Sequence, residues 1–310
     1  MRGERVGAKK SGTGGGKAHT FGGDWTSRKL DILTKYLTAY TTALKDQPFR
    51  KAYIDAFAGT GYRTRRDERS SRGPLFPDLA EPDPQSLLDG SARMALQVIP
   101  RFDRYIFIDS NADRCAQLET LKNEFPDLGP DISIRTAEAN DEIQKLCAMN
   151  WKSRRAVLFL DPYGMQVEWQ TIADVASTKA IDMWLLFPLG IGVNRLLTKS
   201  GEIPDSWRTR LDILLGTEDW YDEFYTVEST PTLFGTDEQR VTKAATETIG
   251  RYFNARLKSV FAGVSEKPAV LRNSRNCPLY LLCFDAGNDR GAPIAIRIAD
   301  NLLKGVEAWR

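Results

Sequence analysis

Two short apolar segments constrain the fold of this chain most, because each runs into a sharp turn next to an acidic residue. The first, 53–57, opens into a turn that contains Gly59 and Gly61. The second, 157–160, ends in the corner 161–164, with the sequence Asp-Pro-Tyr-Gly. Glycine has no Cβ atom, so the backbone of the first turn can approach a ligand closely. Apolar strands that end in such turns are typical of α/β sheets that bind a small ligand at one edge.

Strand-length apolar runs alternate with stretches of helical period along most of the chain. Strands are expected at 52–57, 105–108, 132–134, 156–160 and 183–187, and two closing strands at 269–271 and 278–285. Helices are expected at 30–44, 91–98, 112–122, 141–149, 169–176 and 292–305. Strands that alternate with crossing helices form parallel sheets. The sequence therefore predicts an α/β fold with a doubly wound, Rossmann-like sheet.

The chain is expected to form one domain, 21–310, with irregular parts. Residues 1–20 are basic and rich in glycine, which predicts a flexible tail. Residues 63–90 contain several prolines and little periodicity, which predicts an irregular surface insertion. Residues 192–261 are rich in tryptophan and tyrosine and predict a helical insertion before the last two strands, with a long helix from 237 to 260.

Composition argues against several other classes of protein. The net charge of +2 is too small to indicate a polyanionic partner, although a cluster of five arginines within 63–72 makes nucleic-acid contact possible. The apolar run 183–189 is far shorter than the ~20 residues of a membrane helix, and the amino terminus lacks the apolar core of a secretory signal. We therefore expect a cytoplasmic protein. The four cysteines are scattered and His19 is the only histidine, so no metal site is expected.

Polar residues follow the first four predicted strands, and in a parallel sheet these strand ends meet at the edge that binds ligands. Gly59 and Gly61 would let the backbone pass close to the methionine part of S-adenosyl-L-methionine, with Asp55 orienting its ammonium group through water or backbone. Asp109 can accept both hydroxyls of a ribose, since a carboxylate has two acceptor oxygens. Glu138 or the adjacent backbone could accept the adenine amino group. The predicted cofactor-binding residues are Asp55, Phe57, Gly59, Gly61, Asp109, Glu138, Ala139 and Asn140.

Other nucleotide sites fit the glycine turn less well. A dinucleotide site needs G-x-G-x-x-G and an acidic residue ~20 positions later, whereas the pattern here is A-F-A-G-T-G-Y and Asp109 lies much farther along the chain. A phosphate-binding P-loop is excluded because no lysine-serine or lysine-threonine pair follows the glycines. A nucleotide- or NAD-binding enzyme is kept as a third interpretation.

The corner after the fourth strand predicts chemistry on a planar amine. The exocyclic amine of a nucleobase is a poor nucleophile, because its lone pair is delocalised into the ring. Asp161 and the backbone carbonyl beside Pro162 could accept the two amine hydrogens and so favour a tetrahedral nitrogen, while Tyr163 could stack on the base. We therefore predict Asp161, Pro162 and Tyr163 as catalytic residues of an N-methyltransferase. The alternative is that Asp161 only ends a strand and caps a helix.

This corner resembles the D-P-P-Y motif of methyltransferases that act on amino groups of nucleic acids, and the D-P-F-G form of enzymes that methylate guanine N2 in tRNA. A target base inside a duplex would have to be flipped out. Methylation at cytosine C5 is disfavoured, because it needs a nucleophilic cysteine and none is close to the corner in sequence.

Longer stretches resemble the three-Cys-motif partner protein family, from His19 to about Gly305. They lie at 21–26, 29–30, 53–61, 139–140, 159–167, 186–188 and 194–195. The resemblance implies a class I methyltransferase-like fold with S-adenosyl-L-methionine as cofactor, and a partner protein with three cysteines, similar to radical S-adenosylmethionine proteins. It also implies an alternative function, that of a non-catalytic or cofactor-binding subunit of that partner.

Overall fold

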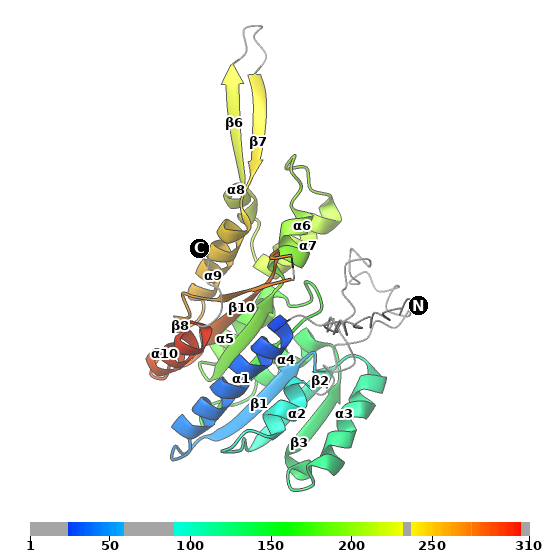
Figure 1. The fold of residues 1–310 in the computed structure, drawn as a ribbon, viewed down its shortest axis with the longest axis vertical. Helices are drawn as coiled ribbons and strands as arrows, with labels where there is room; N and C mark the ends of the chain where they lie inside the picture. Colours follow the sequence, from blue (N-terminus) through cyan, green and yellow to red (C-terminus); the bar gives the residue numbers. More distant parts are fainter. Residues whose placement is uncertain (1–23, 59–89, 232–236, 274, 305–310) are drawn as a thin grey trace, which may run out of the picture.

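The computed structural model describes residues 24–58, 90–231, 237–273 and 275–304 (Figure 1). The predicted tail 1–20, residues 63–89 of the predicted insertion, Gly59 and Gly61 lie outside the described residues.

A single large sheet forms the centre of the protein, with the strand order β3-β2-β1-β4-β5-β10-β8 and with β9 paired to β10. Five strands are mutually parallel: β1 (Arg50–Ala56), β2 (Arg104–Asp109), β3 (Ile132–Thr136), β4 (Arg154–Leu160) and β5 (Ile181–Phe187). The antiparallel part consists of β10 (Pro278–Ala286), β8 (Gly263–Val264) and β9 (Ala269–Arg272). The strand order reverses between β1 and β4, which confirms the predicted doubly wound sheet.

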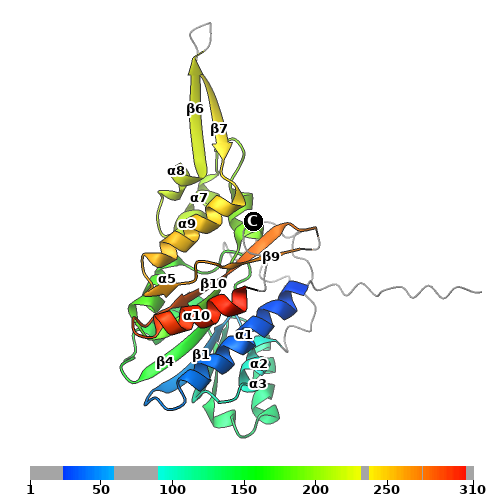
Figure 2. The ribbon, with the colours of Figure 1, turned by 60° about the vertical axis from the view of Figure 1, so that its left-hand side comes forward.

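Helices cover both faces of this sheet (Figures 1 and 2). One face packs against α1 (Asp24–Ala43), α2 (Ser91–Leu96), α3 (Ala112–Glu124) and α10 (Ala292–Leu303). The other face packs against α4 (Ala139–Cys147), α5 (Trp169–Ser177), α7 (Asp205–Leu215) and α9 (Thr246–Lys258). Because both faces are covered, the central strands are nearly continuous apolar runs, and every residue of β5 is buried. A 3-10 turn, η4 (Gly129–Asp131), leads into β3.

The region 192–261 contains helices, but also a hairpin that the sequence did not predict. After η5 (Leu189–Val193), α6 (Asn194–Leu196), α7 and α8 (Trp220–Phe224), the chain forms β6 (Tyr225–Pro231) and β7 (Asp237–Lys243). These two strands pair antiparallel and stand out from the body of the protein (Figures 1 and 2). The predicted helix 237–260 was therefore wrong at its start, and α9 begins at Thr246. Strand pairing with the β-branched residues of β6 outweighs the weak helical period of 237–243.

No helix in the described part of the chain combines the length and the apolar character that crossing a membrane would require.

Two buried aspartates, Asp182 in β5 and Asp285 in β10, interact electrostatically. Asp285 is fully buried, and neither of its carboxyl oxygens has a hydrogen-bond partner among the described residues. Burial raises its pKa well above the ordinary value, and Asp182 raises it further. Burial also raises the pKa of Asp182 to about 6, although hydrogen bonds from the Tyr36 hydroxyl and the Gly287 amide oppose this shift.

We expect Asp285→Asn to stabilise the protein increasingly as the pH rises. An unfolded aspartate ionises near pH 3.9, whereas the pKa of folded Asp285 is raised. The contribution of Asp285 to stability is therefore most favourable below about pH 4 and declines until the pH passes its folded pKa. The variant lacks this loss, so the difference in unfolding free energy should grow by up to about 1.4 kcal/mol per pH unit. Urea unfolding at several pH values measures it, and a difference independent of pH would contradict the expectation.

Candidate functional site

The candidate site lies at the carboxyl ends of β1, β2 and β4, beside the point where the strand order reverses. Asp55 is the last residue but one of β1, Asp109 ends β2, and Asp161 directly follows β4. The parallel registers of β1 with β2 and with β4 bring these three positions to the same edge of the sheet. The amino-terminal end of α1 lies at this edge as well, because its Lys29 contacts Asp161.

Asp161 forms a buried ion pair that the sequence analysis missed. The Nζ atom of Lys29 lies 2.5 Å from Oδ2 of Asp161. The Lys29 side chain is 2% exposed and that of Asp161 is 23% exposed, so the carboxylate faces solvent and the ammonium does not. Lys29 Nζ also lies 5.9 Å from the centre of the Phe159 ring. Helical periodicity could have indicated that Lys29 is buried, since it lies on the same face of α1 as Leu33 and Tyr36.

Asp55 points into the protein rather than towards solvent. The Tyr53 hydroxyl donates a hydrogen bond of 3.1 Å to its Oδ2 atom, and Ser91 bonds to it as well. Burial raises the pKa of Asp55 to about 7, against the lowering effect of these two hydrogen bonds. The nearby charge of Asp161 raises this pKa and that of Lys29 lowers it, so the three groups form one electrostatic cluster. A direct contact between Asp55 and a cofactor is thereby disfavoured, and its predicted role through water or backbone stays a prediction.

The chain leaves β1 through a strained residue. Phe57 has a φ of 83°, in the left-handed region that a bulky side chain rarely adopts. The amides of Phe57 and Ala58 both donate to the carbonyl oxygen of Ile108, at 2.9 and 3.1 Å. Strained backbone of this kind persists only where its surroundings hold it, and it is frequent at binding sites. It sets the direction of the chain towards Gly59 and Gly61, which lie outside the described residues.

Asp109 is buried at the turn between β2 and α3. Its Oδ1 atom accepts a hydrogen bond of 2.7 Å from the amide of Asn111, and its Oδ2 atom lies 3.6 Å from the Arg114 guanidinium. Asn111 in turn caps the amino terminus of α3. The predicted ribose-binding acid therefore also stabilises the local turn, and Arg114 is a charged neighbour that the sequence analysis did not single out.

Glu138 caps the amino terminus of α4. Its side chain accepts hydrogen bonds of 3.0 Å from the amide of Asp141 and from Nδ2 of Asn140. Ala139 is buried in the core beneath this turn. A capping carboxylate with two partners is held in one orientation.

Asn140 fastens the loop that follows Asp161. Its Nδ2 atom donates to the carbonyl oxygen of Gln166 at 2.9 Å. Its Oδ1 atom accepts from the amide of Glu168 at 3.0 Å and from the Thr171 hydroxyl at 2.9 Å. The side-chain amide of Asn140 is thus engaged within the protein, which favours a positioning role over direct contact with a cofactor.

The corner 161–164 is a tight turn with an exposed aromatic ring. Pro162 is buried, whereas Tyr163 is 38% exposed. The Tyr163 amide donates to Oε1 of Gln166 at 3.2 Å. Gly164 has a φ of +72°, and a Cβ atom there would meet nothing within 4 Å. The corner therefore presents an aromatic face beside open space.

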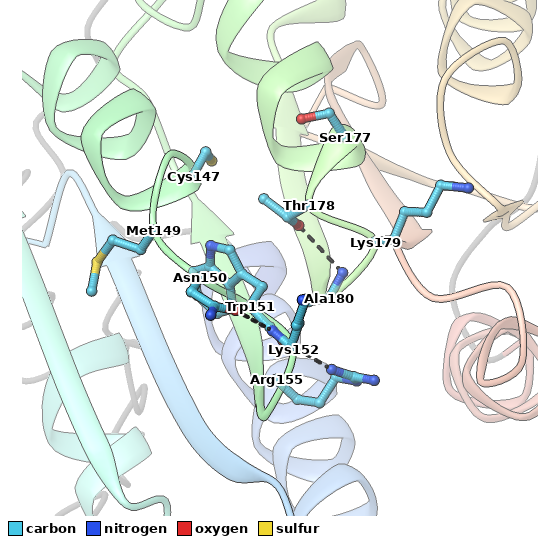
Figure 3. A pocket seen from close by; sticks show the side chains of 10 residues that line it. All are labelled: Cys147, Met149, Asn150, Trp151, Lys152, Arg155, Ser177, Thr178, Lys179 and Ala180. Carbon is cyan, nitrogen blue, oxygen red and sulfur yellow. Dashed lines mark hydrogen bonds between the residues drawn. The ribbon is translucent and has the colours of Figure 1, made fainter.

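A hollow of about 430 Å³ lies at the opposite edge of the sheet, near the amino ends of β4 and β5 (Figure 3). Lys152, Arg155 and Lys179 contribute to its wall, together with Cys147 and Trp151. None of the predicted site residues lines it. We place the candidate site at the carboxyl edge, because parallel sheets bind ligands there.

Three comparisons relate the chain to known proteins. No family model and no curated protein matches it. Among solved structures it is similar to protein LPL1258 from Legionella pneumophila, with 12% identity over 93% of this chain and 94% of that one and a TM-score of 0.45. It is also similar to an O-methyltransferase from Bacillus cereus, with 11% identity over 69% of this chain and 80% of that one and a TM-score of 0.31. A third similar structure is magnesium protoporphyrin IX methyltransferase from Synechocystis, with 14% identity over 70% of this chain and 81% of that one and a TM-score of 0.32.

The strand order and the crossing helices define a doubly wound, Rossmann-like α/β fold. The resemblance to three-Cys-motif partner proteins stays a prediction.

Proposed function

We propose that this protein is an S-adenosyl-L-methionine-dependent methyltransferase that acts on an exocyclic amino group of a nucleic-acid base. One observation carries the proposal: Asp161 and Tyr163 are accessible on either side of the buried Pro162, in a corner at the end of β4 next to the switch point of the sheet. Solved methyltransferases with related folds hold S-adenosylmethionine or its product.

The hydrogen-bonding groups at the carboxyl ends of the parallel strands fit this cofactor. Asp109 lies at the carboxyl end of β2, and its carboxylate offers two acceptor oxygens, the number that a ribose diol requires. The backbone around Glu138 and Ala139 would hold the adenine, and the strained turn at Phe57 would guide the backbone along the methionine part. When bound, the cofactor supplies a methyl group on a positively charged sulfur.

The residues of the corner would bind and orient the acceptor. Asp161 accepts an N–H of the amine through Oδ1, which accepts no hydrogen bond from the described residues. The exposed ring of Tyr163 stacks on the planar acceptor and excludes water from one side. Asn140 keeps this loop in place through the Gln166 carbonyl and the Glu168 amide.

We expect wild-type protein to bind S-adenosyl-L-methionine and Asp109→Ala to bind it at least about tenfold more weakly, because two charge-assisted hydrogen bonds are lost. Isothermal titration calorimetry measures both affinities. Asp113→Ala is the matched control, since it removes an exposed acid from the first turn of α3. Equal affinity in all three proteins, or no binding by the wild type, would contradict the proposal.

A second candidate is a cofactor-binding subunit without catalysis that serves a three-cysteine partner protein. The observation that favours it is the ion pair, because Lys29 already engages one oxygen of Asp161. Cofactor binding without methyl transfer to DNA or RNA, together with co-purification of that partner, would support this candidate over the first.

A further inference from the structure

We infer that the edge of the sheet at which the parallel strands begin binds the phosphate backbone of a nucleic acid, RNA or DNA. This edge, called the amino edge below, lies opposite the candidate site. The inference goes beyond the proposed function, since it requires neither the cofactor nor methyl transfer. It follows from the charge, the register and the exposure of the residues that begin three neighbouring strands.

Three consecutive strands of the sheet begin with an arginine. Arg104 is the first residue of β2, Arg50 of β1 and Arg154 of β4, and these strands are neighbours in the order β2-β1-β4. All three side chains are exposed. We call these residues the arginine row. The three acids of the candidate site lie at the other ends of the same strands, so the two edges of the sheet differ in charge.

The register places the arginine row on one face of the sheet. Arg50 and Arg154 are direct partners in the pairing of β1 with β4. Arg104 is the partner of Ala52, which lies two positions beyond Arg50 and therefore on the same face. Neighbouring strands are about 4.8 Å apart, so the three side chains follow one another across roughly 10 Å of the sheet.

This arrangement of like charges favours an anionic ligand. Like charges on opposite residues of neighbouring strands are destabilising. No acid among the described residues forms an ion pair with the arginine row. Arg104 donates one hydrogen bond of 3.0 Å to the Pro130 carbonyl oxygen, which leaves most of its five N–H donors for a ligand. A nucleic-acid duplex carries one negative charge per ~1.7 Å of its axis, so several phosphates can face the row.

The segments at the start of β1, β2, β4 and β5 are basic as a whole. These segments are 44–51, 97–104, 148–155 and 178–181. They contain nine lysines and arginines but only two acids, whereas the whole chain contains 43 and 41. Both acids already face a lysine, because Asp46 and Asp103 each lie 3.9 Å from one. A clustered basic surface of this kind is typical of proteins that bind nucleic acids. On one side it ends at Asp131, which precedes β3.

The hollow of Figure 3 continues this basic surface beside β4. Lys152 and Lys179 line the hollow, and both are exposed. Lys179 lies 3.5 Å from Asp289, but these side chains are 68% and 69% exposed, so water screens the pair. Arg155 has a different role, because its guanidinium lies 3.9 Å from the centre of the Phe49 ring and donates to backbone carbonyl oxygens. It is therefore not part of the arginine row.

The distance between the two edges of the sheet suits a long nucleic acid. β4 has seven residues. At ~3.3 Å per residue, these span about 23 Å. Phosphates held at the amino edge would therefore belong to nucleotides well away from an acceptor at the corner. Phosphate contacts fix the position of a nucleic acid and carry no sequence information. The arginine row would thus determine affinity rather than the choice of base.

Binding of labelled strands by the full chain tests the inference in the absence of the cofactor. A fluorescein-labelled RNA of about 30 nucleotides and the DNA of the same sequence are titrated at several NaCl concentrations, and fluorescence anisotropy gives the Kd. We expect the wild type to bind at least one of the strands, with an affinity that falls as the salt concentration rises. Failure to bind either strand at low salt, or a Kd that does not depend on salt, would overturn the inference.

Neutralising the arginine row tests where the strand binds. The variant carries three substitutions: Arg50→Gln, Arg104→Gln and Arg154→Gln. The loss of three phosphate contacts should reduce the slope of log K against log salt by about 2 and raise the Kd at least about tenfold. The variant should melt no lower than the wild type, because it loses no ion pair and relieves a repulsion. If it does not fold, the three single variants decide, and each should reduce the slope by about 0.7.

A matched control removes the same charge from other surfaces. It carries Lys35→Gln in α1, with Arg251→Gln and Lys258→Gln in α9, and all three residues are exposed. We expect its Kd for the strand to stay within about threefold of wild type, since only the long-range field changes. Equal weakening in the two triple variants would show that net charge alone attracts the strand, and would overturn the inference.

Two further measurements separate this surface from the candidate site and from other anionic partners. The variant of the arginine row should bind S-adenosyl-L-methionine as the wild type does. A wild type that binds the strand but not the cofactor would contradict the proposed function and leave this inference standing. Vesicles of phosphatidylcholine and phosphatidylserine, and poly-glutamate, are offered as competitors. If either binds as tightly as the strand and also requires the arginine row, the assignment to nucleic acid is overturned.

Discussion

The Asp161→Ala variant is expected to be less stable than wild type by about 3 kcal/mol and to lose methyl transfer. The loss of stability arises because Lys29, at 2% exposure, would keep its buried charge without the carboxylate that now lies 2.5 Å away. Removal of one partner from a buried ion pair costs far more than the pair contributes as a whole. Urea unfolding followed by circular dichroism measures the difference at equilibrium.

The matched comparison for this variant is Lys29→Met. Asp161 is 23% exposed, so solvent reaches the carboxylate that Lys29→Met leaves behind, and the apolar side chain suits the buried position. We expect it to destabilise the protein by only about 1 kcal/mol. Equal losses of unfolding free energy in Asp161→Ala and Lys29→Met would show that the burial of Lys29 does not determine the energetics of the ion pair.

Gly190→Ala is expected to destabilise the protein by about 3 kcal/mol or more. Gly190 lies in η5 directly behind the end of β5, and a Cβ atom there would lie 1.8 Å from the carbonyl oxygen of Pro278 in β10. The obstacle is backbone of a central strand, so it cannot rotate away as a side chain would. The midpoint and slope of chemical unfolding measure the loss.

Two other glycines serve as controls for Gly190→Ala. A Cβ atom at Gly129 would make an ordinary contact of 3.5 Å with the Lys122 carbonyl oxygen, so Gly129→Ala should be nearly neutral. Gly164→Ala meets no atom but keeps a φ of +72°, and should cost only about 1 to 2 kcal/mol of backbone strain. A small effect at Gly190, comparable to that at Gly129, would mean that η5 can move away from β10.

The central strands could be predicted from sequence because both of their faces are buried. A strand such as β5 is then apolar at every position, and its length and flanking turns are enough to identify it. The hairpin β6–β7 gave no such signal, since most of its described side chains are exposed and its polar residues do not alternate clearly. β8 has only two residues, and pairing with β10 defines it rather than any pattern of its own.

The places of the candidate site residues in the sheet could be predicted from the sequence, but the contacts of their side chains could not. Strand ends in a parallel sheet meet at one edge, so Asp55, Asp109 and Asp161 could be placed there from the sequence alone. The partners of these acids come from other elements: Lys29 from α1, Arg114 from α3 and Ser91 from α2. Asn140 likewise pairs with a loop that follows a different strand. Such pairings depend on tertiary packing, and their roles in binding remain predictions.

The ion pair between Lys29 and Asp161 joins residues that are 132 positions apart in the chain. During synthesis, α1 leaves the ribosome long before β4 is complete, and its packing partner α10 is made last of all. Until most of the sheet exists, the first helix therefore carries Lys29 on its apolar face without the carboxylate of Asp161 beside it. Closing so long a loop carries an entropic cost that later contacts must offset. The corner is thus among the last features of the protein to reach its final geometry during synthesis.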